Sequence, residues 1–280
     1  VATFGDALPV IPLEVPAVVG PGCPQPETSA AVVSSIERAV GYVTGGQATA
    51  IVTNPIQKKA LYDCGFQYPG HTEFLATFAD GDAQPVMMLA CDQLRVVPVT
   101  VHQPLREAID SLRSANIVKT VWTTVRALRR DFAIDRPHVA IAALNPHAGE
   151  EGAMGREEIE IIAPAVEELK QAGYSVTGPT PVDTMFHDRA RTAYDAAVCM
   201  YHDQALIPLK TIDFSSGVNI TLGLPFVRTS PDHGTALEIA GTGVADESSL
   251  VAALKIAARI AGNRTRSRLI SDDRVSNRLH

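Results

Sequence analysis

Three histidines each follow a short apolar run, at the point where a buried strand would end. His102 comes after VVPVTV, His147 after VAIAALNP and His202 after AAVCMY. Short runs rich in Val, Ile and Ala are typical of buried strands, and open α/β sheets place their ligand clefts at the carboxyl ends of strands. Three neutral imidazoles that converge there would hold a divalent metal and leave room for water or substrate. The pattern therefore predicts a metal-dependent enzyme.

The residues around each histidine leave an alternative open. His147 lies in LNPHAGEEG, whose proline and glycines indicate a shaped site, although a connecting turn with a helix cap has the same composition. His202 is followed by Asp203 and Gln204, a carboxylate and an amide that can orient an imidazole bound to a metal; otherwise it is a structural histidine. His102, in TVHQP, fits a turn into a helix equally well.

Polar residues elsewhere are candidates for binding an anionic substrate. The segment GHTEF, residues 70–74, predicts a helix that begins with Thr72 as its cap. The free amides of such an end, together with His71 and Thr72, attract a phosphate or a carboxylate, and a plain helix cap is the alternative. Three further donors would clamp an oxyanion if they converge, and would be surface residues if they do not. These are Lys210, Asn219 and Arg228.

The most distinctive local segment is SPDHGTALEIAGTG, residues 230–243. Its glycines and hydroxyls suit a backbone that wraps a phosphate or an adenosine, and it is not the GxGxxG sequence of a Rossmann domain. It resembles the His-Gly-Ser/Thr-Ala loop that holds the adenosine part of the nicotinamide cofactor in isocitrate and isopropylmalate dehydrogenases. By this resemblance the candidate cofactor-binding residues are Asp232, His233, Gly234, Thr235 and Ala236.

Apolar strands alternate with amphipathic helices along the chain. This order predicts an α/β fold with a largely parallel sheet that is covered by helices on both faces. The expected strands are residues 50–52, 86–90, 96–101, 139–144 and 196–200, and the expected helices are residues 30–43, 104–112, 117–130, 156–172 and 247–261. Residues 262–280, rich in Arg, Ser and Asp, are expected to be frayed or bound to the surface.

Composition argues against several classes of protein. The 280 residues are 46% hydrophobic and carry a net charge of −7, which is unlike a nucleic-acid-binding protein, and no apolar run approaches the roughly 20 residues of a membrane span. Residues 1–20 lack the charged start and cleavage site of a signal peptide. The cysteines form no CxxC pair, as expected for reduced thiols; they are Cys23, Cys64, Cys91 and Cys199. We therefore expect a cytoplasmic protein with no nucleic-acid or membrane partner, in which an anionic substrate needs a local cationic pocket.

Five long blocks occur over most of residues 50–260. They are YPGHTEFLA at 68–76, LNPHAGEEGAMGREE at 144–158, PVDTMFH at 181–187, YHDQALIPLK at 201–210 and GVNITLGLPFVRTSPDHGTALEIAGTG at 217–243. In content and order they closely resemble the 4-hydroxythreonine-4-phosphate dehydrogenase (PdxA) family of pyridoxal phosphate biosynthesis. The glycine-rich strand and turn of the type GDPAGIGPE with which that family's members begin has no counterpart in this sequence.

The resemblance implies the architecture of the molecule. It implies two α/β/α lobes with largely parallel sheets and an active site in the cleft between them, as in isocitrate and isopropylmalate dehydrogenases. Residues 1–70 and 220–280 would form the lobe on the cofactor side, without the family's first strand. Residues 71–219 would form the second lobe, which carries the metal, the substrate and the contact surface of a homodimer.

The resemblance also implies roles for individual residues. His102, His147 and His202 match the ligands of a divalent metal, and one of these histidines reaches the site from the partner subunit. Asp183, in PVDT, matches an acidic residue near the metal and the substrate. The positions that match the family's substrate-binding residues are His71, Thr72, Lys210, Asn219 and Arg228.

The implied reaction is the oxidation of a phosphorylated hydroxy-amino acid by NAD or NADP, followed by decarboxylation. Lys210 or Asp183 would handle the proton, and the sequence does not choose between them. It also does not choose among zinc, cobalt, magnesium and manganese. The alternatives are a related dehydrogenase that acts on threonate 4-phosphate or on the cis-dihydrodiol of terephthalate, and a catalytically silent metal- or nucleotide-binding homologue. Zinc hydrolase chemistry is disfavoured, because the His-Gly-Thr-Ala loop would then have no cofactor to hold.

Overall fold

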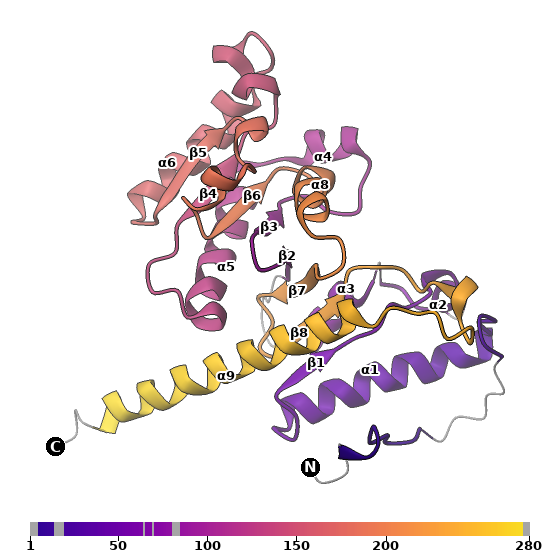
Figure 1. The fold of residues 1–280 in the computed structure, drawn as a ribbon. Coiled ribbons are helices and arrows are strands. Elements are labelled where there is room, and N and C mark those ends of the chain that lie inside the picture. Colours follow the sequence, from indigo (N-terminus) through magenta and orange to yellow (C-terminus); the bar gives the residue numbers. More distant parts are fainter. Residues whose placement is uncertain (1–4, 14–19, 64, 69, 80–84, 277–280) are drawn as a thin grey trace.

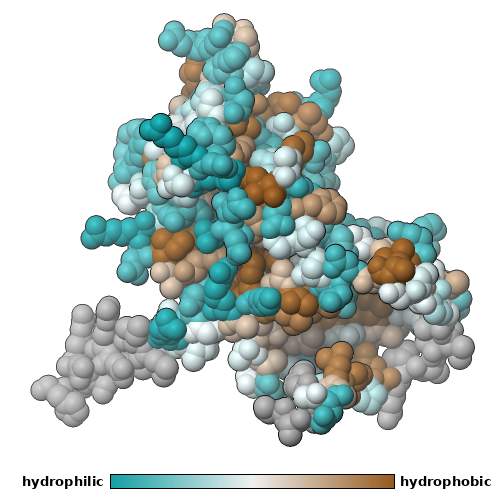
Figure 2. All heavy atoms as spheres, in the orientation of Figure 1, coloured by the Kyte–Doolittle hydropathy of each residue, from teal (hydrophilic) through white to brown (hydrophobic). Residues whose placement is uncertain are grey.

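The computed structural model describes residues 5–13, 20–63, 65–68, 70–79 and 85–276, with the side chains of residue 26 and residues 268–276 left out. Cys64 lies outside the described residues, whereas Cys23, Cys91 and Cys199 are free thiols, as the sequence predicts. None of the described helices is long and apolar enough to cross a membrane. On the face that Figure 2 presents, hydrophobic residues form scattered patches among hydrophilic ones.

The described strands form one mixed sheet in the order β1-β8-β7-β2-β3-β6-β4-β5. The strands are β1 Ala50–Val52, β2 Val86–Ala90, β3 Arg95–Pro98, β4 Val139–Ala142, β5 Val176–Thr180, β6 Ala196–Cys199, β7 Val218–Leu222 and β8 Val227–Pro231. Strands β3, β6, β4 and β5 are parallel to one another, and β1 is parallel to β8. The pairings β8–β7, β7–β2 and β2–β3, which join these two parallel groups, are antiparallel.

Helices cover both faces of the sheet, and the predicted α/β class is confirmed. The helices are α1 Ser29–Thr44, α2 Lys58–Asp63, α3 His71–Ala76, α4 Leu105–Ser111, α5 Ser114–Phe132, α6 Ala163–Gln171, α7 Asp188–Arg191, α8 His202–Ile212 and α9 Ser248–Ser276. Helices α5, α6 and α9 share a core with one face of the strands, and α8 packs on the opposite face. This alternation is visible along β3, where Val97 faces α5 and Val96 faces α8. A third core lies between α1, α3 and β1.

Figure 1 shows two groups of elements, one built around β3 to β6 with α4 to α8 and the other around β1 and β8 with α1. The chain passes from one group to the other through β2 and β7. The boundary that the resemblance implies, between residues 219 and 220, falls within β7, and the division into two lobes at that residue stays a prediction.

Most predicted elements are confirmed to within a few residues, and three differ in detail. Pro104 precedes α4 as its N-cap and is not its first residue. The helix expected over 156–172 begins with a π-helical turn, Glu158–Ile162, before α6. Residues 262–276, predicted to belong to a frayed or surface-bound tail, instead continue α9, and Arg264 among them is buried and held by polar contacts.

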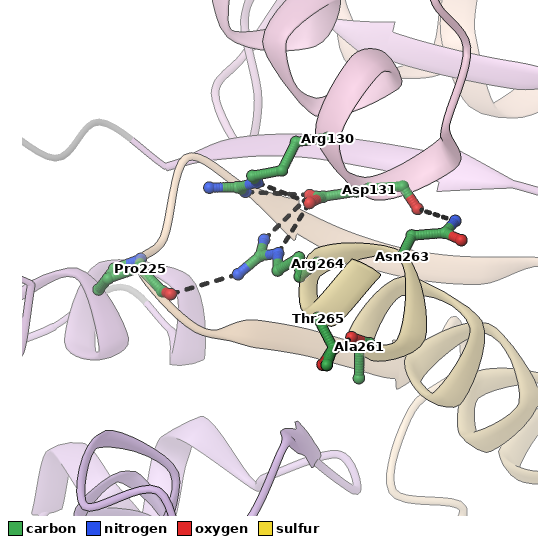
Figure 3. A network of polar contacts seen from close by, with 7 residues as sticks. All are labelled: Arg130, Asp131, Pro225, Ala261, Asn263, Arg264 and Thr265. Atoms are coloured by element: carbon green, nitrogen blue, oxygen red, sulfur yellow. Dashed lines mark hydrogen bonds and ion pairs between the residues drawn. The ribbon is translucent and has the colours of Figure 1, made fainter. Parts of the chain in front are cut away.

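Those contacts form the network in Figure 3, which joins α5 to α9. The buried Asp131 carboxylate accepts two hydrogen bonds from Arg264, at 2.7 and 2.9 Å, and two from Arg130. Asn263 donates to the Asp131 carbonyl, and Arg264 reaches the carbonyl of Pro225 between β7 and β8. Burial alone would raise the pKa of Asp131, but the hydrogen bonds from the two arginines outweigh it and hold the pKa below its usual range. The network therefore fixes α9 to α5 and to the connection between β7 and β8.

Replacing Arg264 by Met is expected to reduce the free energy of unfolding by about 2–4 kcal/mol, since Asp131 would lose its buried partner. Arg130→Met removes the half-exposed partner of the same carboxylate, and should cost no more than about 1 kcal/mol. Urea unfolding of both variants measures the difference. Equal, small losses would contradict the assignment of Arg264 as the main partner.

Candidate active site

The carboxyl ends of β3, β6 and β4 lie next to one another, because these three strands are parallel neighbours. His202 begins α8 directly after β6. His102 lies four residues beyond β3, and His147 lies in the turn Pro146–Gly152 that follows β4. The predicted strand-end location of all three histidines is therefore confirmed.

The backbone of Met200 ties these three strand ends together. The hydroxyl of Thr100, beyond β3, donates to the Met200 carbonyl at 2.8 Å. The Met200 amide donates to the side-chain oxygen of Gln204 at 2.7 Å, and the Gln204 amide nitrogen donates to the carbonyl of Ala143, beyond β4, at 2.8 Å. The buried Gln204 side chain therefore joins the ends of β6 and β4. The sequence suggests a different role for it, the orientation of His202.

His102 and His202 face the same pocket. Their ring centroids are 5.8 Å apart, and both line a cavity of about 360 Å³ together with Tyr201, Asp203 and Leu105. A carboxylate oxygen of Asp203 lies 2.7 Å from His202 Nδ1, as the sequence predicted for an oriented ligand, and this contact leaves Nε2 available. Partial burial and then the charge of Lys58 lower the pKa of His102, which favours the neutral imidazole that binds metals.

Both His102 and His147 have a backbone conformation that is unfavourable for histidine. Their φ angles are 51° and 52°, and residues 147–151 all have positive φ, although only Gly149 among them is a glycine. A left-handed conformation costs a residue with a side chain about 1–2 kcal/mol, and strain of this kind persists where the surrounding structure enforces it, often at functional sites. The two turns therefore have a strained backbone, which an ordinary connection does not require.

A buried carboxylate holds the strained turn in place. Glu158 Oε1 accepts hydrogen bonds from the backbone amides of Leu144 and Asn145, at 2.8 and 2.7 Å, and Oε2 accepts one from the Asn145 side chain at 2.9 Å. Burial raises the pKa of Glu158, but these hydrogen bonds outweigh it and lower the pKa. A Cβ atom on Gly149 would lie 2.7 Å from Glu158 Oε2, so only glycine fits at this position.

One chain does not bring all three histidines together. Among the residues that the structure describes, no group of three His, Cys, Asp or Glu side chains is arranged to hold a metal ion. The turn that carries His147 instead contacts Val182–Thr184, which contains the exposed Asp183. The predicted residues thus fall into two groups, one with His102 and His202 and the other with His147 and Asp183.

Asn219 and Arg228 lie on one face of the paired strands β7 and β8. Asn219 is directly opposite Ser230, and Arg228 is two residues before Ser230. Arg228 is buried and donates to the hydroxyls of Thr221 and Thr53, at 3.1 and 2.7 Å. Its Nε and the Asn219 Oδ1 are buried and have no hydrogen-bond partner among the described residues. A buried cation bonded to hydroxyls, with a donor left over, suits an anionic ligand.

His71 is the first residue of α3, and the charge of Arg228 acts on its imidazole. Burial, then Arg228 and Lys58, lower the pKa of His71 to about 4. The prediction that Thr72 caps this helix is wrong: the N-cap is Gly70, whose extended backbone (φ −179°) ends before the first helical residue. Thr72 therefore lies inside the first turn.

Sequence reasoning missed two charged residues of this region, Lys58 and Glu73. The charge of Lys58 acts on both His71 and His102, and that of Glu73 acts on both Arg228 and His102. Each of these two charges therefore acts on both an anion-binding residue and one of the paired histidines. The position of Lys58, six residues beyond β1, was a signal of the same kind as the strand-end histidines.

The predicted cofactor loop, residues 232–236, directly follows β8. His233 and Gly234 are exposed, and nothing lies within 4 Å of the point where a Gly234 side chain would begin, so the loop is open on that side. Ala236 has a φ of 45°, another strained position. Asp232 points inward, and its carboxylate lies 2.9 Å from Lys210 Nζ. The structure thus joins the first residue of the loop to a predicted substrate-binding lysine.

An α/β sheet with histidines at its strand ends, beside a buried arginine and an open glycine-containing loop, defines an enzyme of the α/β class. Residues 2–257 match the family described as pyridoxal phosphate biosynthetic protein PdxA, and the chain belongs to this family.

Its relatives include dehydrogenases with two different names. The 4-hydroxythreonine-4-phosphate dehydrogenase of Bradyrhizobium diazoefficiens is 54% identical, over 94% of this chain and 77% of that protein. The solved structure of the dehydrogenase of the same name from Klebsiella pneumoniae is 43% identical, with a TM-score of 0.82, over 90% of this chain and 75% of that one. A terephthalate 1,2-cis-dihydrodiol dehydrogenase from Burkholderia xenovorans is 28% identical, with a TM-score of 0.64, over 88% of this chain and 77% of that one.

The low pKa of His71 predicts a loss of stability in acid. The folded chain keeps His71 neutral down to a pH of about 4, whereas the unfolded chain takes up the proton near the ordinary pKa of 6.5. The unfolded state binds more protons between these values, so acidification from pH 6.5 towards 4 reduces the free energy of unfolding, by on the order of 1–3 kcal/mol. His71→Gln removes this contribution. Denaturant unfolding at pH 7.5 and 5.0 measures it; equal pH dependence in wild type and His71→Gln would show that His71 is not shifted.

Proposed function

We propose that this protein oxidises 4-phosphohydroxy-L-threonine with NAD or NADP. The product is 2-amino-3-oxo-4-phosphooxybutanoate, which loses carbon dioxide to give 3-amino-2-oxopropyl phosphate. The name shared by relatives at about half identity supports this reaction. The structural observation that carries it is the His102–His202 pair at the strand ends, in the same sheet as a buried and incompletely satisfied Arg228.

The residues present fit a divalent metal. His102 and His202 present two imidazoles to one pocket, and Asp203 fixes the ring of His202. The third ligand would be His147 of the partner subunit in a homodimer, since one chain keeps its own His147 in a separate group. When bound, zinc, cobalt, magnesium or manganese would favour ionisation of the substrate hydroxyl and stabilise the negative charge that develops on decarboxylation.

The substrate carries a phosphate and a carboxylate, and the proposed site supplies donors for both. Arg228 offers its unpartnered Nε, and Asn219 lies on the same strand face. His71 and Thr72 occupy the first turn of α3, and Lys210 lies on α8, two turns after His202. This local set of donors offsets the overall negative charge of the protein. In the proposed role all five residues bind and orient the substrate.

The proton would be handled by Lys210 or Asp183. Lys210 lies on the same helix as His202, one of the proposed ligands of the same chain. Asp183 lies on the segment that contacts the turn of His147, so it would enter the site together with the partner's His147. The two candidates would therefore reach the substrate from different subunits.

NAD or NADP would bind at the loop of Asp232, His233, Gly234, Thr235 and Ala236. The loop follows β8 at the same sheet region as Arg228, so a cofactor bound there would lie beside the substrate. Its exposed backbone at His233 and Gly234 leaves room for a bulky group. We place the homodimer in the cytoplasm, where both cofactors are available.

A turnover assay with 4-phosphohydroxythreonine as substrate tests the function, with reduction of the nicotinamide cofactor as the readout. Wild type is expected to reduce the cofactor, to lose activity with a chelator and to regain it with added metal. His147→Ala is expected to lose at least about 100-fold in kcat/KM without a change in unfolding, since a ligand is lost; His187→Ala, at another exposed histidine, is the matched control. Near-normal activity of folded His147→Ala would contradict the metal assignment. Faster turnover of threonate 4-phosphate or of a cis-dihydrodiol would assign the substrate to a related dehydrogenase.

A further inference from the structure

The contact between Lys210 and Asp232 joins two regions that are 22 residues apart in sequence. Lys210 Nζ lies 2.9 Å from Asp232 Oδ2 and donates to the Asp232 carbonyl at 3.5 Å. Asp232 therefore contacts the Lys210 ammonium with both its side chain and its backbone carbonyl. Lys210 is 34% exposed and Asp232 is 17% exposed, so water screens the attraction only in part.

The pair is held mainly by charge. Asp232 Oδ2 is buried and accepts no hydrogen bond of good geometry from the described residues, although Nζ is close to it. Because an ammonium has three N–H donors, this arrangement leaves donors of Lys210 free for another acceptor. Lys210 Nζ also lies 5.7 Å from the centre of the Phe214 ring, which adds a weaker attraction.

The position of Asp232 explains where it holds the lysine. Asp232 follows β8 directly, and Arg228, Ser230 and Asp232 are spaced two residues apart. Asn219, opposite Ser230, belongs to the same face. By drawing Lys210 from α8 towards the end of β8, Asp232 brings its ammonium to the strand face that carries Asn219 and Arg228.

We infer that Asp232 is a positioning residue for Lys210 and acts on the substrate through the lysine, an inference that rests on the proposed function. A lysine side chain has four flexible carbons and loses much rotamer freedom when it is fixed. Asp232 fixes it before the substrate arrives, so the substrate's anionic group meets Lys210 already in place. Within the cofactor loop, the residues from His233 to Ala236 would then make most of the side-chain contacts with the cofactor.

A double-mutant cycle with inorganic phosphate as the probe tests this role. Asp232→Asn is expected to weaken phosphate binding about tenfold by calorimetry in the wild-type background, since it removes the charge that fixes Lys210. In the Lys210→Met background the same change should alter phosphate binding by less than about twofold, because the lysine through which Asp232 acts is absent. Asp232→Glu, which keeps the charge, should restore part of the affinity.

Cofactor binding separates this role from a direct contact. The Kd of NAD, measured by fluorescence without turnover, should rise less in Asp232→Asn than in Thr235→Val, a change in the same loop. The inference would be overturned if Asp232→Asn changed phosphate affinity equally in the wild-type and Lys210→Met backgrounds. It would also be overturned if Asp232→Asn lost as much NAD affinity as Thr235→Val, or if wild type bound no phosphate. A wild type that binds phosphate in this pattern but does not oxidise 4-phosphohydroxythreonine would contradict the proposed function alone.

Discussion

The backbone of Met200 is the constraint on which the candidate site depends. Its carbonyl accepts the Thr100 hydroxyl and its amide donates to Gln204, which in turn donates to Ala143. These three bonds lie past the last strand residues, beside a backbone hydrogen bond from the Thr100 amide to the same Met200 carbonyl. Because all the groups are buried, a lost partner would leave an unsatisfied polar group at a cost of about 1–3 kcal/mol. The strand ends that carry the three histidines are therefore fixed relative to one another.

The turns beyond those strand ends are strained, and the strain has local support. Glu158 supplies a buried carboxylate to the amides at the start of the His147 turn, and Gly149 leaves space for that carboxylate. The anion-binding side is built differently, on hydroxyls around a buried Arg228 that has no ion pair within the described residues. The strained backbone of the His147 turn and the desolvated charge of Arg228 both reduce the stability of the folded chain. Such costs are common at functional sites.

The sequence predicts those parts of the fold and the site that depend on local pattern. Apolar runs locate the strands, and adjacency along the chain locates Asp203 beside His202. The remaining features depend on contacts between distant residues. Gln204 joins strands because β4 pairs with β6. The charge of Lys58 reaches His102, and Lys210 meets Asp232, only in the folded chain, because the partners are far apart in sequence. The strain at His147 is also invisible in sequence, since nothing but the surrounding structure enforces it.

The central claim is that His102 and His202 of one chain form a metal site with His147 of the partner subunit. Mixing two inactive variants, His102→Ala and His147→Ala, tests it most directly. If the site is shared, each mixed dimer has one intact site, so a random mixture should recover about a quarter of wild-type turnover. A mixture that forms mixed dimers but stays as inactive as either parent would show that all three ligands come from one chain, and would contradict the account.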